Sequence, residues 1–247
     1  ILGLRKDLDM KNAPEIAITV APINQTICNA FAKGCGGRIV PCHQSGDRVA
    51  TYGIKRGSGE SIKRASEFWY IDHGYFGKGS PHRFDGYYRI VYNNIINDTS
   101  GDFSSDRLDK FNIKLKDWRK NGDKVIMVPP SLPMGKFLGV PTEVWIQETK
   151  KEIQKYTDRK IVICQKEKGK KSNLTQLLES AWVLVTDHSN CQVDALVAGV
   201  PVITTSPMRK IGSLAEIESP VMDRSFLKNL AYRQWTIKEI ESGQAWR

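Results

Sequence analysis

Short apolar runs alternate with stretches of helical spacing along most of the chain. In the first half the apolar runs predict strands at residues 15–20, 38–41, 49–54, 68–71 and 88–94. Apolar residues at helical spacing predict helices at residues 24–33 and 58–67. In the second half the same reasoning predicts strands at 124–128, 160–164, 182–185 and 201–204, helices at 142–156 and 173–180, and a further helix that ends at Gly199. This alternation is typical of α/β proteins with mostly parallel sheets.

The polar stretch at residues 97–123 divides the two halves. Within it, residues 106–120 are expected to form a basic helix with its few large apolar side chains on one side. An Asn-Gly-Asp turn at 121–123 then marks a domain boundary. The sequence therefore predicts two Rossmann-like parallel-sheet domains, residues 1–122 and 123–222, followed by a tail, residues 223–247, of two helices. The second domain has the βαβαβαβ order of a doubly wound nucleotide-binding domain.

The stretch at residues 182–205 carries the clearest chemical signal. A buried strand is followed by a polar corner at 186–190, a helix, and a second buried strand that begins at Pro201. The corner thus lies at the carboxyl end of a strand and the amino end of a helix. Backbone N–H groups and the helix dipole favour a phosphate there. Asp194, early in the helix, is placed to accept hydrogen bonds from sugar hydroxyls.

A second candidate site follows the strand predicted at residues 68–71. Asp72 and His73 come at its carboxyl end, where ligands gather in open parallel sheets. Two interpretations stay open for this pair: proton transfer in catalysis, or ordering of its own loop. The next loop, residues 76–88, has neither strand nor helix periodicity and contains Lys78, His82 and Arg83. It is either a substrate-binding loop or a long connection with aromatic side chains packed on the core.

Composition narrows the class of protein. The chain has 247 residues, 40% hydrophobic and 26% charged, which is typical of a globular protein. No apolar run is long enough to cross a membrane, and no signal-peptide pattern is present, so we expect no membrane insertion and a cytoplasmic location. Five irregularly spaced cysteines predict buried free thiols rather than a disulfide framework or a zinc site.

The formal net charge of +10 and the pI near 9.3 point to an anionic partner. Nucleotides, nucleotide-sugars, anionic glycans, nucleic acid and anionic membrane surfaces all fit this charge. The basic residues recur in both halves, so a polyanionic partner is expected.

The stretch at 182–205 resembles the donor-binding signature of GT-B glycosyltransferases. The resemblance rests on DHSN at residues 187–190, DAL at 194–196 and GVPVI at 199–203. It implies a GT-B-like fold with a cleft between two domains, in which the second domain holds the nucleotide-sugar and the first holds the acceptor. Helices at the end of such chains often pack back onto the first domain, and the same is expected here.

The resemblance also implies roles for individual residues. The base that takes the proton from the acceptor hydroxyl would be Asp72 or His73. The expected donor-binding residues are Ser131, Gln165, His188, Ser189, Asn190 and Asp194. Possible phosphate or acceptor contacts are Lys136, Lys78, His82 and Arg83. A metal site of the GT-A type is not expected, so neither a catalytic metal nor a cofactor is expected, with the nucleotide-sugar as co-substrate.

Three functions are consistent with these features. The first is transfer of a sugar, expected from a UDP-sugar, to hydroxymethylated pyrimidines of DNA, as in phage enzymes that the short basic chain resembles. The second keeps the fold and transfers the sugar to a surface polysaccharide, as in capsule and lipopolysaccharide sugar transferases. The third is a nucleotide- or nucleic-acid-binding α/β protein without catalysis.

Overall fold

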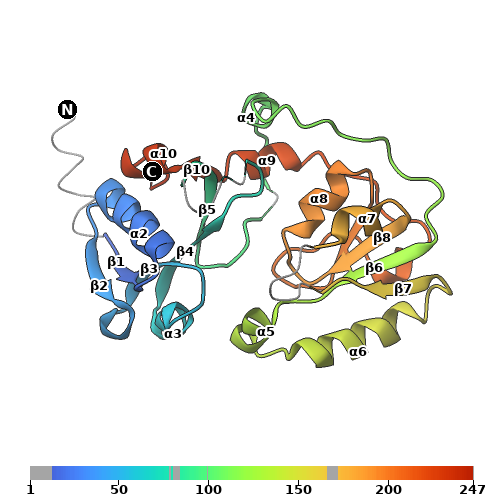
Figure 1. Cartoon of the computed structure of the whole chain (residues 1–247), viewed down its shortest axis with the longest axis horizontal. Coiled ribbons are helices and arrows are strands. Elements are labelled where there is room, and N and C mark those ends of the chain that lie inside the picture. The colour runs from blue at the N-terminus through green and yellow to red at the C-terminus, as the bar shows by residue number, and fades with distance from the viewer. Residues whose placement is uncertain (1–12, 78, 80–83, 99, 166–171, 247) are drawn as a thin grey trace. The chain divides into compact units, whose positions relative to one another are not determined.

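A computed structural model describes residues 13–77, 79, 84–98, 100–165 and 172–246. The chain forms two compact units, each built around its own sheet (Figure 1). Unit 1 comprises Ile1–Asn97 and Asn229–Arg247, and unit 2 comprises Asp98–Lys228. The α/β class predicted from the alternating pattern is confirmed.

The sheet of unit 1 has six strands in the order β10-β5-β4-β3-β1-β2. The strands are β1 (Glu15–Ile18), β2 (Arg38–Pro41), β3 (Arg48–Tyr52), β4 (Glu67–His73), β5 (Tyr87–Tyr92) and β10 (Gln234–Thr236). The first four run parallel, whereas β5 and β10 pair antiparallel, so this sheet is mixed rather than parallel throughout. The β4–β5 register runs from Trp69 opposite Tyr92 to His73 opposite Tyr88.

Helix α2 (Pro22–Cys35) covers this sheet with a buried face that includes Ile27 and Phe31. It begins with proline in its first turn and ends at Gly36, whose φ of 73° terminates the helix. Helix α10 (Ile237–Glu241) packs against α2 (Figure 1), where Gly34 leaves room for the Ile240 carbonyl. The other helices of this region are η1 (Cys42–Gln44), α3 (Ser58–Arg64) and α9 (Leu227–Ala231).

The tail contains a strand that the sequence did not predict. Residues 223–247 were expected to form two helices, and α9 and α10 are present, but β10 lies between them and extends the sheet of unit 1. Its three residues are too few to give a periodic signal. A capping box at Thr236 and Glu239 then begins α10.

The sheet of unit 2 is parallel throughout, in the order β7-β6-β8-β9. Its strands are β6 (Lys124–Val128), β7 (Lys160–Ile163), β8 (Ala181–Thr186) and β9 (Val202–Thr204). Its helices are α5 (Leu132–Leu138), α6 (Thr142–Ile153), α7 (Leu174–Leu178), α8 (Cys191–Val197) and η2 (Leu214–Glu216). The pattern missed α5, because Pro133 and Gly135 obscure a helix of only seven residues.

Residues 106–120 do not form the expected basic helix. Only α4 (Asp106–Asp109) is helical; a turn follows at 110–112, and residues 113–119 have no regular secondary structure. Figure 1 shows this part of the chain as a long stretched loop, and it is called the extended segment below. The Lys116 and Arg119 amides donate to the carbonyls of Val197 (3.0 Å) and Gly199 (2.8 Å), so hydrogen bonds to the end of α8 replace those of a helix. These contacts place residues 98–122 in unit 2, whereas the sequence placed the boundary after residue 122.

Both sheets reverse their order of strand addition. In unit 2 the chain passes from β6 to β7 on one side and then to β8 on the other side of β6. In unit 1 it passes from β1 to β2 and then to β3 on the other side of β1. The loops after β6 and β8, and those after β1 and β3, therefore diverge at the carboxyl edge of each sheet, where α/β proteins bind ligands.

The extended segment depends on Gly199. A Cβ at Gly199 would lie 2.0 Å from the Asp117 carbonyl oxygen, and the residue has a φ of 74°. We expect Gly199→Ala to lower the free energy of unfolding by about 2–5 kcal/mol, from backbone strain and overpacking together. Gly139→Ala is the matched control, since Gly139 has the same φ with nothing within 4 Å, and it should cost only about 1–2 kcal/mol. Urea unfolding measures both, and equal losses would contradict the close contact.

Candidate functional site

The candidate site of unit 2 lies where the order of its strands reverses. Val128 and Thr186 are paired at the carboxyl ends of β6 and β8, and the Thr186 hydroxyl donates to the Val128 carbonyl at 2.8 Å. The loops that follow begin side by side. They bring Ser131 to the same edge as residues 187–190, and this group of residues is called the switch-point corner below.

His188 is a buried side chain of the switch-point corner. It is 8% exposed, and its Nδ1 contacts the Asp187 carboxylate. Because a carboxylate accepts hydrogen bonds, Nδ1 carries the proton, and Nε2 is the nitrogen left for a ligand. Within the described part of the chain, Nε2 forms no hydrogen bond. The sequence predicted a role for His188 but none for Asp187, although an acidic residue beside a histidine at a strand end was visible.

Ser189 and Asn190 lead into α8. The Ser189 hydroxyl accepts from the Cys191 amide at 3.4 Å, and the Ser189 carbonyl accepts from both the amide and the side chain of Gln192. Asn190 is the residue before the helix and makes no capping hydrogen bond with its side chain. Asp194 is exposed on the first turn. Sequence reasoning missed Gln192, which is fully buried and whose Oε1 has no partner among the described residues.

The remaining predicted donor residues lie around this edge. Ser131 is exposed and directly precedes α5, and Lys136 is exposed in the last turn of that helix. Gln165 is exposed just after β7, which neighbours β6, so it lies at the same edge one strand away from the reversal. Lys78, His82 and Arg83 lie outside the described residues.

Asp72 forms a cross-strand ion pair in unit 1. Its Oδ2 accepts from Arg89 Nη2 at 3.2 Å and from the Tyr70 hydroxyl at 2.7 Å, and its Oδ1 accepts from the His73 amide at 2.8 Å. Arg89 faces Asp72 across the β4–β5 pair, is 4% exposed, and lies over the rings of Tyr70 and Tyr75. Both carboxylate oxygens therefore serve the structure of the sheet.

His73 points to the opposite face of β4, since successive residues of a strand alternate. Its ring stacks on Tyr88 with centroids 6.1 Å apart, and its Nε2 lies 3.1 Å from the Tyr52 hydroxyl. Burial, and after it the negative charge of Asp72, raise the pKa of Tyr52, so the phenol stays protonated. The two residues do not form a catalytic dyad, because their side chains lie on different faces.

The cysteines are buried free thiols, as predicted. Burial raises the pKa of Cys28 and of Cys191 to about 12 and that of Cys35 to about 11, which disfavours the reactive thiolate. In the described residues no three His, Cys, Asp or Glu side chains come together as a group that could hold a metal ion. No helix among them has the length and apolar character that crossing a membrane requires.

No protein-family model matches the chain, and no curated protein matches its sequence. Two solved structures from Thermosulfurimonas dismutans are similar in fold. The KpsC beta Kdo 2,4 transferase has a TM-score of 0.51 and 12% identity, over 89% of this chain and 89% of that one. The KpsC beta Kdo 2,7 transferase has a TM-score of 0.51 and 13% identity, over 94% of this chain and 98% of that one. At such low identity the likeness shows the fold alone, and it confirms the predicted Rossmann-like α/β class.

The ion pair of Asp72 with buried Arg89 predicts a structural effect of mutation. Asp72→Asn leaves a buried guanidinium without its counter-charge, and we expect a loss of about 3–5 kcal/mol in the free energy of unfolding. Tyr70→Phe removes only one hydrogen bond to the same carboxylate and should cost about 1 kcal/mol. Urea unfolding followed by circular dichroism measures both. A stable Asp72→Asn variant would contradict the structural role.

Proposed function

We propose that the protein is a glycosyltransferase that transfers a sugar from a nucleotide-sugar to a hydroxyl group of a glycan. The observation that supports this most is the switch-point corner, in which the loops that carry Ser131 and residues 187–190 begin side by side at the carboxyl edge of a parallel sheet, with His188 oriented by Asp187. The fold that carries this corner is shared with two Kdo transferases.

In this proposal unit 2 binds the donor. Hydroxyl and amide groups of Ser131, Ser189 and Asn190 donate to phosphate oxygens, and protonated His188 donates from Nε2 to the phosphate that leaves. Asp187 holds the ring in place and stabilises its positive charge. Asp194, exposed on α8, accepts from hydroxyls of the sugar or ribose. Gln165 meets the nucleobase through its backbone, and Lys136 adds positive charge near the phosphates.

We assign the base to His73 rather than to Asp72. The Asp72 oxygens already accept three hydrogen bonds, one of them from the guanidinium of Arg89. In the tautomer whose Nε2–H donates to Tyr52, the Nδ1 atom of His73 keeps its lone pair. It takes the proton of the acceptor hydroxyl as that oxygen bonds to the anomeric carbon. The bond from the anomeric carbon to the phosphate oxygen breaks, and its electron pair leaves with the nucleotide.

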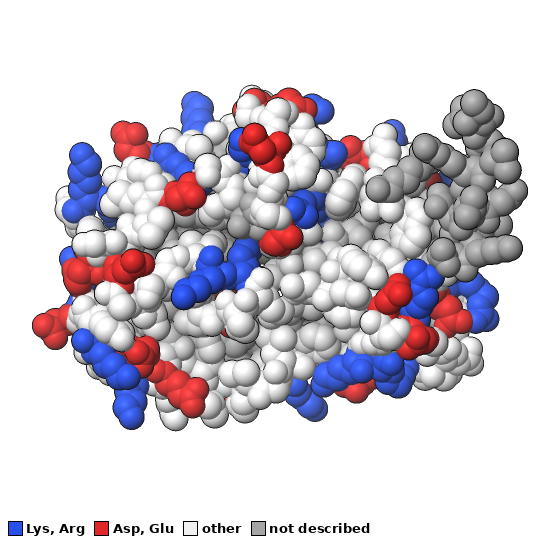
Figure 2. Space-filling model, turned by 180° about the vertical axis from the view of Figure 1, so that it is seen from behind, with Lys and Arg blue, Asp and Glu red and all other residues white. Residues whose placement is uncertain are grey.

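The acceptor is better supported as a glycan than as DNA. The two proteins of similar fold are named for 2,4 and 2,7 Kdo transfer, and neither name refers to DNA. The DNA acceptor rests on the net charge of +10, and Figure 2 shows Lys and Arg interspersed with Asp and Glu over the face in view rather than gathered in one band. Transfer to hydroxymethylated pyrimidines, and UDP as the nucleotide, stay predictions from the sequence.

Donor binding is tested by thermal shift. Nucleoside mono- and diphosphates with different bases should raise the melting temperature, because they bind only the folded protein. His188→Gln should weaken this binding about tenfold through loss of a charge-assisted hydrogen bond. Lys150→Gln, an exposed change on α6, is the control that should leave affinity unchanged. If no nucleotide shifts the melting temperature of the wild type, the donor site is wrong.

Catalysis is tested with nucleotide-activated Kdo and UDP-sugars as donors, against glycan acceptors and duplex DNA carrying hydroxymethylated bases. His73→Gln should lower kcat about 100- to 10,000-fold while nucleotide affinity stays the same. Tyr52→Phe should have a smaller effect, since it removes one partner of the ring. Unchanged transfer in His73→Gln would exclude this residue as the base. Transfer to DNA alone would reverse the acceptor, and nucleotide binding without any transfer would favour a non-catalytic protein.

A further inference from the structure

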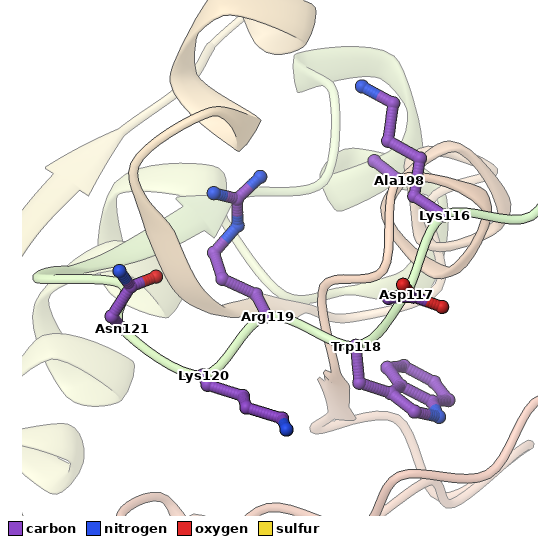
Figure 3. A pocket seen from close by; sticks show the side chains of 7 residues that line it. All are labelled: Lys116, Asp117, Trp118, Arg119, Lys120, Asn121 and Ala198. Carbon is purple, nitrogen blue, oxygen red and sulfur yellow. The ribbon is translucent and has the colours of Figure 1, made fainter.

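The extended segment of unit 2 forms one wall of a hollow at the other end of α8. Figure 3 shows its lining, which is Lys116, Asp117, Trp118, Arg119, Lys120 and Asn121 together with Ala198. Its volume is about 600 Å³, within the range of small-molecule sites and large enough for one or two sugar rings. It is called the Trp118 hollow below.

The Trp118 hollow is separate from the switch-point corner. Asn190 begins α8 at the carboxyl edge of the sheet, and Ala198 follows the last residue of the helix. A helix of seven residues is about 10 Å long. Because α8 connects the carboxyl end of β8 to the amino end of the parallel strand β9, the last residue of α8 lies toward the amino edge of the sheet. Residues of the hollow therefore do not belong to the proposed donor site.

The backbone of the hollow is held in place independently of any ligand. Two main-chain hydrogen bonds tie Lys116 and Arg119 to the end of α8, and Gly199 permits the close approach. Arg224 donates to the carbonyls of Lys116 (2.7 Å) and Leu196 (3.2 Å), and its guanidinium lies 4.5 Å from the ring centroid of Trp118. Arg119 donates through Nη1 to the Glu179 carbonyl at 2.6 Å. A site fixed in advance loses little conformational freedom when it binds.

The side chains of the hollow combine positive charge with an aromatic ring. Lys116 and Lys120 are exposed, and their ammonium groups form no hydrogen bond or ion pair with the described residues. Trp118 is half-buried. In Figure 3 the Trp118 and Lys120 side chains leave the segment on one side, and Lys116 and Arg119 leave it on the other. Lysine ammonium groups recognise carboxylates and phosphates as point charges, and an indole face packs on the C–H face of a sugar ring.

We infer that the Trp118 hollow is a binding site for an acidic oligosaccharide, distinct from the donor site. Trp118 stacks on one sugar ring, Lys120 on the same side of the segment contacts a carboxylate beside it, and Lys116 contacts a carboxylate further along the oligosaccharide. Asp117 and Asn121 decide between glycan and nucleic acid, because a carboxylate and an amide suit sugar hydroxyls, whereas the carboxylate repels a chain with a phosphate at every residue. This inference rests on one part of the proposed function, which is that the protein acts on glycans.

Such a site would hold one part of an acidic glycan on unit 2 while the end of the glycan that accepts the sugar lies outside the hollow. Tethering through a second contact raises the effective concentration of the acceptor without a new contact at the reaction centre. For a transferase acting on acidic chains, the hollow would lower KM for long acceptors and leave kcat for short ones unchanged.

Fluorescence anisotropy with a labelled oligogalacturonate, which carries one carboxylate per sugar, tests the inference in the absence of any donor. We expect binding that weakens as salt is raised, since exposed charges are screened within about 10 Å at 0.1 M. Lys116→Gln with Lys120→Gln should weaken it roughly tenfold, the size expected for two exposed charge contacts. Lys150→Gln with Lys151→Gln removes the same charge from α6 and should leave binding unchanged.

A neutral glucan of equal length and a single-stranded DNA of equal charge are the comparison ligands, and both should bind more weakly. Trp118→Leu should also weaken oligogalacturonate binding, with thermal unfolding as a check that the variant is folded. The inference is overturned if the two lysine pairs have equal effects, if the neutral glucan binds as tightly, or if the DNA binds as tightly and Trp118→Leu has no effect. Because no donor is present, these outcomes are independent of the nucleotide-binding and transfer experiments.

Discussion

The pairing of β6 with β8 is the constraint on which the candidate site depends. Hydrogen bonding between parallel strands fixes their register, and here it sets Val128 beside Thr186 at the carboxyl edge. The chain must then leave in two directions, toward α5 and toward α8. Because the two loops diverge, the polar groups at the carboxyl ends of β6 and β8 are left uncovered by a helix. Without the reversal, the loops that carry Ser131 and His188 would not begin at paired strand ends.

Two aspartate–histidine neighbours show how the same residues take different roles in different surroundings. Asp72 and His73 are successive residues of a strand, so their side chains point to opposite faces, and buried Arg89 pairs with the carboxylate. Asp187 and His188 lie just beyond a strand end, where the backbone turns and lets the carboxylate reach the ring. A histidine held by a carboxylate has a fixed tautomer and orientation, which suits it to contact a charged ligand.

The segment between α4 and β6 depends on tertiary contacts for its form. A short row of Leu108, Phe111, Leu115 and Trp118 suggested a helix over residues 106–120, but only residues 106–109 are helical. Instead the segment bonds through its backbone to the end of α8, and Arg224 fixes it from a part of the chain more than a hundred residues away. In this form Trp118 and Lys120 leave the segment on the same side, as Figure 3 shows, and Lys116 leaves it on the other.

The sequence by itself determined the α/β class, the parallel strands of unit 2 and the polar corner at residues 186–190, because buried strands and helix ends carry strong local signals. It also identified most residues now found at the edge of β6 and β8, since the carboxyl end of a strand can be located from its apolar run. Only the tertiary structure decided the antiparallel β5 and β10, the extended segment, the Asp72–Arg89 pair and the contact of Asp187 with His188. Each of these depends either on which distant segment of the chain packs against the residue or on how the backbone turns. The local spacing of apolar residues predicts neither.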